Sequence, residues 1–158
     1  MMDLNATINQ AQFFMERNRL DEAEKLLLGY LAQDPEQSLV LNLLAYVYYK
    51  GDDLEKAEET IQLAIGLEPD NDRFLYTYTF ILLTKGNYKK AEEFIRQAIQ
   101  FNPEEAEYFG LLANIKINQK DFKAALEYAE QGLAIDPSSV FCLNMKSTAM
   151  VKLGMGDQ

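Results

Sequence analysis

The most constraining feature of this sequence is the spacing of its prolines. The four prolines, each 34 residues after the last, are Pro35, Pro69, Pro103 and Pro137. An alanine stands twelve residues before each of them, at Ala23, Ala57, Ala91 and Ala125. A fixed period of this length indicates structural repeats that stack on one another, in place of a single globular core. We therefore interpret the chain as a series of 34-residue units.

Each unit reads as two helices. In the second unit Leu41, Leu44 and Tyr48 recur at the spacing of one helical face. A second stripe follows with Ala57 and Ile61. The residue before a proline is pushed away from helical geometry, so the second helix of each unit is expected to end there. Small residues at the repeated alanine positions allow the paired helices to approach closely.

The segment between the two helices carries turn signals. Gly51 interrupts the first stripe, and Asp52 followed by Glu55 resembles a capping box with Asp52 as the N-cap. Gly154 occupies the place that Gly86 holds in the third unit. We therefore expect the same interhelical turn at both glycines.

These patterns resemble a known family. The pattern Leu41-x-x-Leu44-Ala45-x-x-Tyr48, then Ala57-x-x-x-Ile61-x-x-Ala64 and Pro69, resembles the tetratricopeptide repeat. The resemblance covers residues 4–37, 38–71, 72–105 and 106–139, with a half repeat at 140–158. It implies an all-α fold, a right-handed α-solenoid of antiparallel helix pairs, with residues 1–158 forming a single domain. One departure is Lys116, which stands where the family usually has tyrosine.

The last segment differs from the other first helices in being strongly apolar. It contains Val140, Phe141, Leu143, Met150 and Val151. We interpret the chain as a fragment of a longer repeat protein; the alternative is that the half repeat is a natural C-terminal cap. An open apolar end also predicts a homodimer formed through this helix.

Composition excludes several function classes. The net charge of −10 argues against nucleic acid or an anionic membrane as the ligand, because both need a cationic footprint. The chain has no histidine, which excludes the usual Ser-His-Asp relay and His-ligated metals. Cys142, the single cysteine, cannot form an internal disulfide and is expected to be a buried or half-buried apolar side chain. We therefore expect no enzyme activity, no metal, no cofactor and no direct membrane insertion, and a cytoplasmic location.

The resemblance also implies where a ligand binds, because the first helices of tetratricopeptide arrays line a concave groove. The candidate groove residues are Asn9, Gln12, Asn42, Tyr46, Tyr49, Arg73, Tyr76, Phe80, Asn114 and Asn144. Asparagine amides can pair with both the N–H and the C=O of an extended peptide. Aromatic rings supply rigid contact area. The alternative is that these aromatic side chains pack only against neighbouring helices.

The resulting hypothesis is a non-catalytic interaction module, a scaffold or adaptor that binds a peptide or helix of a partner protein. Of the residues that grip a C-terminal carboxylate in some family members, only Arg73 has a counterpart here, so that mode is rejected. Two alternatives stay open. One is a small acidic chaperone of a bacterial secretion system. The other is a regulatory or docking domain of a longer enzyme or membrane protein.

Overall fold

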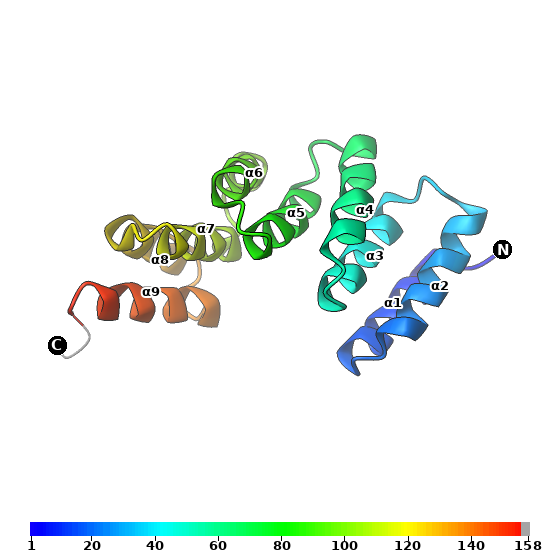
Figure 1. Ribbon diagram of the computed structural model, residues 1–158, viewed down its shortest axis with the longest axis horizontal. Helices are drawn as coiled ribbons and strands as arrows, with labels where there is room; N and C mark the ends of the chain where they lie inside the picture. The colour runs from blue at the N-terminus through cyan, green and yellow to red at the C-terminus, as the bar shows by residue number, and fades with distance from the viewer. Residues whose placement is uncertain (156–158) are drawn as a thin grey trace. The chain divides into compact units, whose positions relative to one another are not determined.

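The computed structural model describes residues 1–155 of the chain, and these form α-helices joined by short turns (Figure 1). The helices are α1 (Leu4–Glu16), α2 (Leu20–Gln33), α3 (Ser38–Lys50), α4 (Leu54–Leu67), α5 (Asp72–Thr84), α6 (Tyr88–Phe101), α7 (Ala106–Asn118), α8 (Phe122–Ile135) and α9 (Val140–Lys152). Within residues 1–155 there is no strand. The prediction of an all-α fold built from helix pairs is confirmed.

The chain divides into two compact units, with the boundary inside α5. The first unit is Met1–Ile81, and the second begins at Leu82. In the first unit α1 packs against α2 and α3 against α4, while α3 also contacts α1 and α2. In the second unit α7 packs against α6, α8 and α9, and α8 also contacts α9. Each unit is described below by itself.

The turn that follows each first helix uses a left-handed residue at the same repeat position. These residues are Asn18, Asp52, Gly86, Lys120 and Gly154. In the second repeat the N–H of Asp53 donates to the carbonyl of Tyr48 at 2.9 Å, and the N–H of Asp52 donates to the carbonyl of Tyr49 at 3.1 Å. This is the Schellman arrangement, and it closes α3. The shared turn expected at Gly86 and Gly154 is confirmed, with φ of 81° and 77°.

The capping prediction was wrong by one residue. Asp53, not Asp52, caps α4, and its carboxylate accepts from the backbone N–H of Lys56 at 3.2 Å. Asp52 cannot serve as the N-cap because its left-handed backbone belongs to the end of α3. Asn87 and Asp121 cap α6 and α8 in the same way.

The second helices end at the residues that the prolines predict. Their last residues are Gln33, Leu67, Phe101 and Ile135, and in each case one cap residue separates the helix from the proline. The ψ angle of these cap residues lies between 80° and 98°, outside the helical region.

Small residues bring the helices close together. Ala23, Ala57, Ala91 and Ala125 are fully buried. Cys142 is also fully buried, as predicted, and its thiol donates to the carbonyl of Ala106 at 3.3 Å. A Cβ placed on Gly132 would lie 2.5 Å from the Cys142 sulfur, so only glycine fits there. Burial raises the pKa of the Cys142 thiol, which keeps it protonated and unreactive.

Candidate functional site

The first unit carries a hollow of about 450 Å³ between α1, α3 and the start of α5. It is lined by Ile8, Gln12, Leu39, Asn42, Leu43, Tyr46, Asn71, Arg73, Phe74, Tyr76 and Thr77. Its volume falls in the range typical of ligand pockets, roughly 300 to 1,000 Å³. Five of the predicted binding residues thus lie around one hollow, although they come from three helices.

A second hollow, of about 600 Å³, continues from the first. Gln12, Leu43 and Tyr46 line both hollows, and Lys50 and Glu16 lie only in the second. We call the two hollows together the groove. It follows the first helices of the repeats, which is the side that the resemblance implied.

The predicted aromatic residues form a continuous cluster in this unit. The rings of Tyr46 and Tyr49 stack with centroids 5.9 Å apart. Tyr49 lies 6.1 Å from Phe80, and Phe80 packs edge-on against Tyr76 at 4.9 Å. Tyr46 and Tyr76 line the groove, so the cluster both packs on itself and presents two rings to the hollow.

Two polar side chains of the groove serve the fold. The Asn71 side chain accepts from the backbone N–H groups of Arg73 at 3.1 Å and Phe74 at 3.4 Å, at the start of α5. The Thr77 hydroxyl donates to the carbonyl of Arg73 at 3.1 Å. Both side chains therefore already make hydrogen bonds with the backbone at the start of α5.

Four other polar side chains of the first hollow make no hydrogen bond or ion pair with any residue in 1–155. They are Gln12, Asn42, Tyr46 and Arg73. The most informative is Asn42, whose Oδ1 atom is buried and unsatisfied among the described residues. A buried acceptor without a partner costs about 1–3 kcal/mol. The groove therefore holds polar groups that the fold itself does not use.

The charge of the groove differs from that of the whole chain. Arg73 and Lys50 contribute two positive charges and Glu16 one negative charge. The chain as a whole has a net charge of −10. The two hollows thus carry one positive charge in excess, although Glu68, Asp70 and Asp72 lie with Arg73 around a neighbouring hollow.

The remaining predicted residues lie elsewhere. Asn9 is exposed on α1 and lines neither hollow. Asn114 and Asn144 belong to the second unit. The Asn114 side chain accepts from the amide of Asn118 at 3.0 Å, while Asn144 is exposed on α9.

Asn71 and Phe74 also line the groove and are not among the residues predicted from the sequence. Asn71 lies just before α5 and Phe74 in its first turn. An asparagine three residues before an apolar helical residue is a helix-start signal that the sequence contains.

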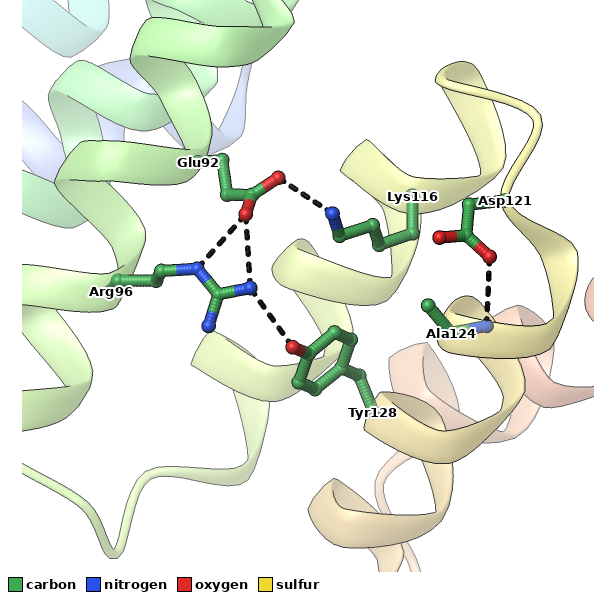
Figure 2. A network of polar contacts seen from close by, with 6 residues as sticks. All are labelled: Glu92, Arg96, Lys116, Asp121, Ala124 and Tyr128. Atoms are coloured by element: carbon green, nitrogen blue, oxygen red, sulfur yellow. Dashed lines mark hydrogen bonds and ion pairs between the residues drawn. The ribbon is translucent and has the colours of Figure 1, made fainter.

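Four polar side chains of the second unit, from three helices, form a network of hydrogen bonds and ion pairs (Figure 2). Glu92 of α6 accepts from Arg96 at 2.9 Å and pairs with Lys116 of α7 at 2.8 Å. Arg96 also donates to the hydroxyl of Tyr128 of α8 at 2.9 Å. Lys116, the departure from the family pattern, therefore joins two helices by an ion pair where an aromatic side chain is usual.

Partial burial raises the pKa of the Glu92 carboxyl, but hydrogen bonds from Lys116 and Arg96 outweigh it and hold the pKa below its ordinary value. Burial by itself lowers the pKa of the Arg96 guanidinium, but hydrogen bonds to Tyr128 and Glu92 outweigh this effect and raise the pKa above its ordinary value. Glu92 and Arg96 are thus held in their charged forms, and this network stabilises the fold.

No group of three or more carboxylate or cysteine side chains in residues 1–155 is placed to hold a metal ion. Among the same residues, every helix is too short or too polar to cross a membrane.

Three family models, each described as a tetratricopeptide repeat, match residues 8–72, 48–115 and 106–139. A comparison with curated protein sequences finds no match. Solved structures share the fold. The thermophilic TPR protein TTC0263 of Thermus thermophilus has a TM-score of 0.87 at 17% identity, over 95% of this chain and 82% of that one.

Two further structures are similar. PilF of Pseudomonas aeruginosa has a TM-score of 0.86 at 22% identity, over 95% of this chain and 68% of that one. YrrB, described as a TPR protein with an unusual peptide-binding site, has a TM-score of 0.70 at 17% identity, over 97% of this chain and 79% of that one. The models together span residues 8–139, and the structures share the helical-repeat fold, so this chain belongs to the tetratricopeptide repeat family.

Proposed function

We propose that this chain is a non-catalytic protein-binding module whose groove, in the unit Met1–Ile81, takes a segment of a partner protein. The tetratricopeptide fold supports a protein-interaction scaffold in general. The observation that carries the finer proposal is the set of unpartnered polar side chains around an apolar hollow, above all Asn42. Binding sites of this kind are concave, mostly apolar and carry a few placed polar groups.

The aromatic cluster supports the same proposal. Tyr46 and Tyr76 are half-buried, so each ring keeps a face that a ligand can cover. Tyrosine is enriched in binding hot spots because it offers large contact area at low entropic cost. YrrB has a peptide-binding site according to its description, and we extend peptide binding to this chain on the groove's own chemistry.

The test is affinity capture with the 158-residue chain and a double variant, Tyr46→Ala with Tyr76→Ala. Tyr88→Ala is the matched control, because Tyr88 begins α6 and lines neither hollow. We expect a partner that the native chain and the control retain and the double variant loses. Circular dichroism must show unchanged helix content in every variant. A partner retained by the folded double variant would place the working surface outside the groove.

We also propose that the chain self-associates through α9. Val140, Leu143 and Val151 of this helix are 68%, 44% and 64% exposed. Burying such side chains is favourable by about 25 cal/mol per Å² of apolar surface. Sedimentation equilibrium over a wide range of protein concentration is the measurement, and a monomer at every concentration would refute this dimer.

A further inference from the structure

We infer that the second unit carries a surface that binds an anionic lipid bilayer, independently of the groove. The surface lies at the end of the unit that holds the turn from α7 to α8. It consists of residues 82–91, 115–125 and 149–155, and we call it the lysine end. These residues include a single acid, Asp121, and seven lysines, which are Lys85, Lys89, Lys90, Lys116, Lys120, Lys123 and Lys152.

Contacts inside the unit bring the three segments to one end. The ion pair of Glu92 with Lys116 joins the start of α6 to the end of α7 (Figure 2). The N–H of Asp121 donates to the carbonyl of Lys116 at 2.9 Å across the turn that leads into α8. Helix α9 packs against α7 and α8, and its Cys142 thiol donates to the carbonyl of Ala106 at the start of α7. Because α7 and α9 have the same length, α9 ends on the side where α7 ends.

Several of these lysines stand where a helix disfavours a cation. Lys89 and Lys90 lie in the first turn of α6, and Lys123 lies in the first turn of α8. The N-terminus of a helix carries a partial positive charge, which favours acids and repels cations. Neither first turn contains an acid, whereas α2 and α4 of the first unit both have acids there. Helix stability therefore does not account for the lysines.

Ion pairing inside the fold does not account for them either. Four of the lysines are exposed and make no ion pair with any residue in 1–155, namely Lys89, Lys120, Lys123 and Lys152. The corresponding end of the first unit, residues 13–23 and 47–57, has four basic and six acidic residues. There Arg19 pairs with Glu22, and Lys56 pairs with Asp53. The positive surface thus belongs to the second unit and is not a general feature of the repeat.

The net charge of −10 predicted that an anionic membrane is not the ligand, but charge acts locally. The opposite end of the second unit, residues 98–109 and 132–143, has four acids and no basic residue. A helix of this length separates the two ends by about 20 Å. The electrostatic screening length at physiological ionic strength is about 8 Å. A surface that contacts the lysine end is therefore screened from the acids at the opposite end.

The side chains of the lysine end favour a lipid surface over other anionic partners. All its basic residues are lysines, which act as point charges, and it lacks the arginine forks that recognise individual carboxylates or phosphates. Apolar side chains accompany the lysines. Leu153 is 40% exposed, and Tyr88 and Phe122 are half-buried at the starts of α6 and α8. The boundary between headgroups and acyl chains accommodates both kinds of side chain, whereas a nucleic-acid backbone offers no apolar contact.

The test is co-sedimentation of the full chain with phosphatidylcholine vesicles that contain about 30% phosphatidylglycerol, an anionic lipid. We expect binding to these vesicles, no binding to pure phosphatidylcholine, and loss of binding when NaCl is raised from about 50 to about 300 mM. Each lysine at a membrane surface contributes about fivefold in affinity. The double variant Lys89→Gln with Lys123→Gln should therefore bind about twentyfold more weakly.

The matched control is Lys25→Gln with Lys56→Gln, which removes two lysines from the first unit and gives the same net charge as the double variant. We expect this control to bind the vesicles within about twofold of the native chain. Urea unfolding should show that the Lys89 and Lys123 variant is at least as stable as the native chain, because cations at helix N-termini do not stabilise them. Leu153→Ser should weaken vesicle binding about threefold through lost apolar contact.

Several results would overturn this inference. One is an absence of binding to the anionic vesicles at low salt. Another is an equal loss of binding in the double variant and its control, which would show that net charge alone matters. Binding of a random-sequence DNA duplex as tightly as the vesicles, with no effect of Leu153→Ser on either, would identify a phosphate-backbone surface in place of a lipid surface. Groove binding is unaffected by all of these outcomes, because the groove lies in the first unit.

Discussion

The two units of this chain differ in how one set of polar side chains in each is used. In the second unit Glu92, Arg96 and Lys116 are all paired, and they join α6, α7 and α8 (Figure 2). In the first unit Asn42 and Arg73 face the groove without partners among the described residues. A paired network stabilises its unit, while an unsatisfied buried group costs free energy. The comparison indicates that the groove keeps polar groups at the expense of stability, as functional sites commonly do.

The first prediction asks whether the units differ only in this polar chemistry. Ile61 and Ile95 occupy the same repeat position, one in each unit, and both are fully buried. We expect Ile61→Ala and Ile95→Ala each to lower the free energy of unfolding by about 2–5 kcal/mol, through lost burial and a cavity. Urea unfolding followed by circular dichroism measures both. A large loss in one variant and none in the other would show that the units differ in their cores as well.

The second prediction breaks the network of the second unit. Lys116→Met removes the ion pair between Lys116 and Glu92, whose side chains are 16% and 21% exposed. We expect the free energy of unfolding to fall by about 1–2 kcal/mol, because the carboxylate loses a charge-assisted hydrogen bond in a partly buried site. Lys123→Met is the control, since Lys123 is exposed on α8. Equal stability of the two variants would mean that Lys116 contributes no more than a surface charge.

The third prediction follows from the lowered pKa of Glu92. A carboxyl whose pKa is lower in the folded state stabilises the protein above its unfolded pKa of about 4.3, and this contribution disappears as pH falls through the folded pKa. We expect Glu92→Gln to be less stable than the native chain by about 1 kcal/mol at a pH of about 7. The difference should shrink toward zero as the pH falls below the unfolded pKa. The measurement is the urea midpoint of the native chain and of Glu92→Gln at several pH values in this range. A difference in stability that does not change with pH would contradict the lowered pKa of Glu92 as its cause.

The fourth prediction concerns the first unit and has the opposite sign. Asn42→Leu removes the unsatisfied amide oxygen and adds apolar contact in the wall of the hollow. We expect the free energy of unfolding to rise by up to about 1 kcal/mol while groove binding is lost. Asn114→Leu is the matched control, because the Asn114 side chain accepts from Asn118 and its removal should not stabilise the chain. If Asn42→Leu destabilises the protein, the amide serves the fold and the contrast between the units disappears.

Much of the fold was predictable because its determinants are local. Pro69 and Pro103 mark helix ends through the restricted backbone of the preceding residue. Ala57 and Ala91 mark close helix packing, and both are buried as expected. The capping residue was misassigned because a short polar turn allows two neighbouring acids, Asp52 and Asp53, to serve as the cap. Only the left-handed φ of 64° at Asp52 distinguishes them.

The candidate site was partly predictable from the family resemblance. The resemblance implied that Asn42, Tyr46 and Tyr76 line one groove, and the structure brings them to one hollow. It could not foresee that Asn71 and Phe74 would line it, because these residues lie where the chain enters α5. Nor could it tell that Asn9 would lie outside, since a helix face covers a range of directions.

The sequence by itself determined the repeat, the helix pairs and the family, because short-range backbone preferences and a 34-residue period suffice to define them. Only the tertiary structure decided which polar side chains are used. Lys116 finds Glu92 on another helix, whereas Asn42 and Arg73 find no partner among the described residues. Hydrogen bonds and ion pairs between helices depend on distances of a few ångströms across packed surfaces, and these distances are set by the packing of all the helices in a unit.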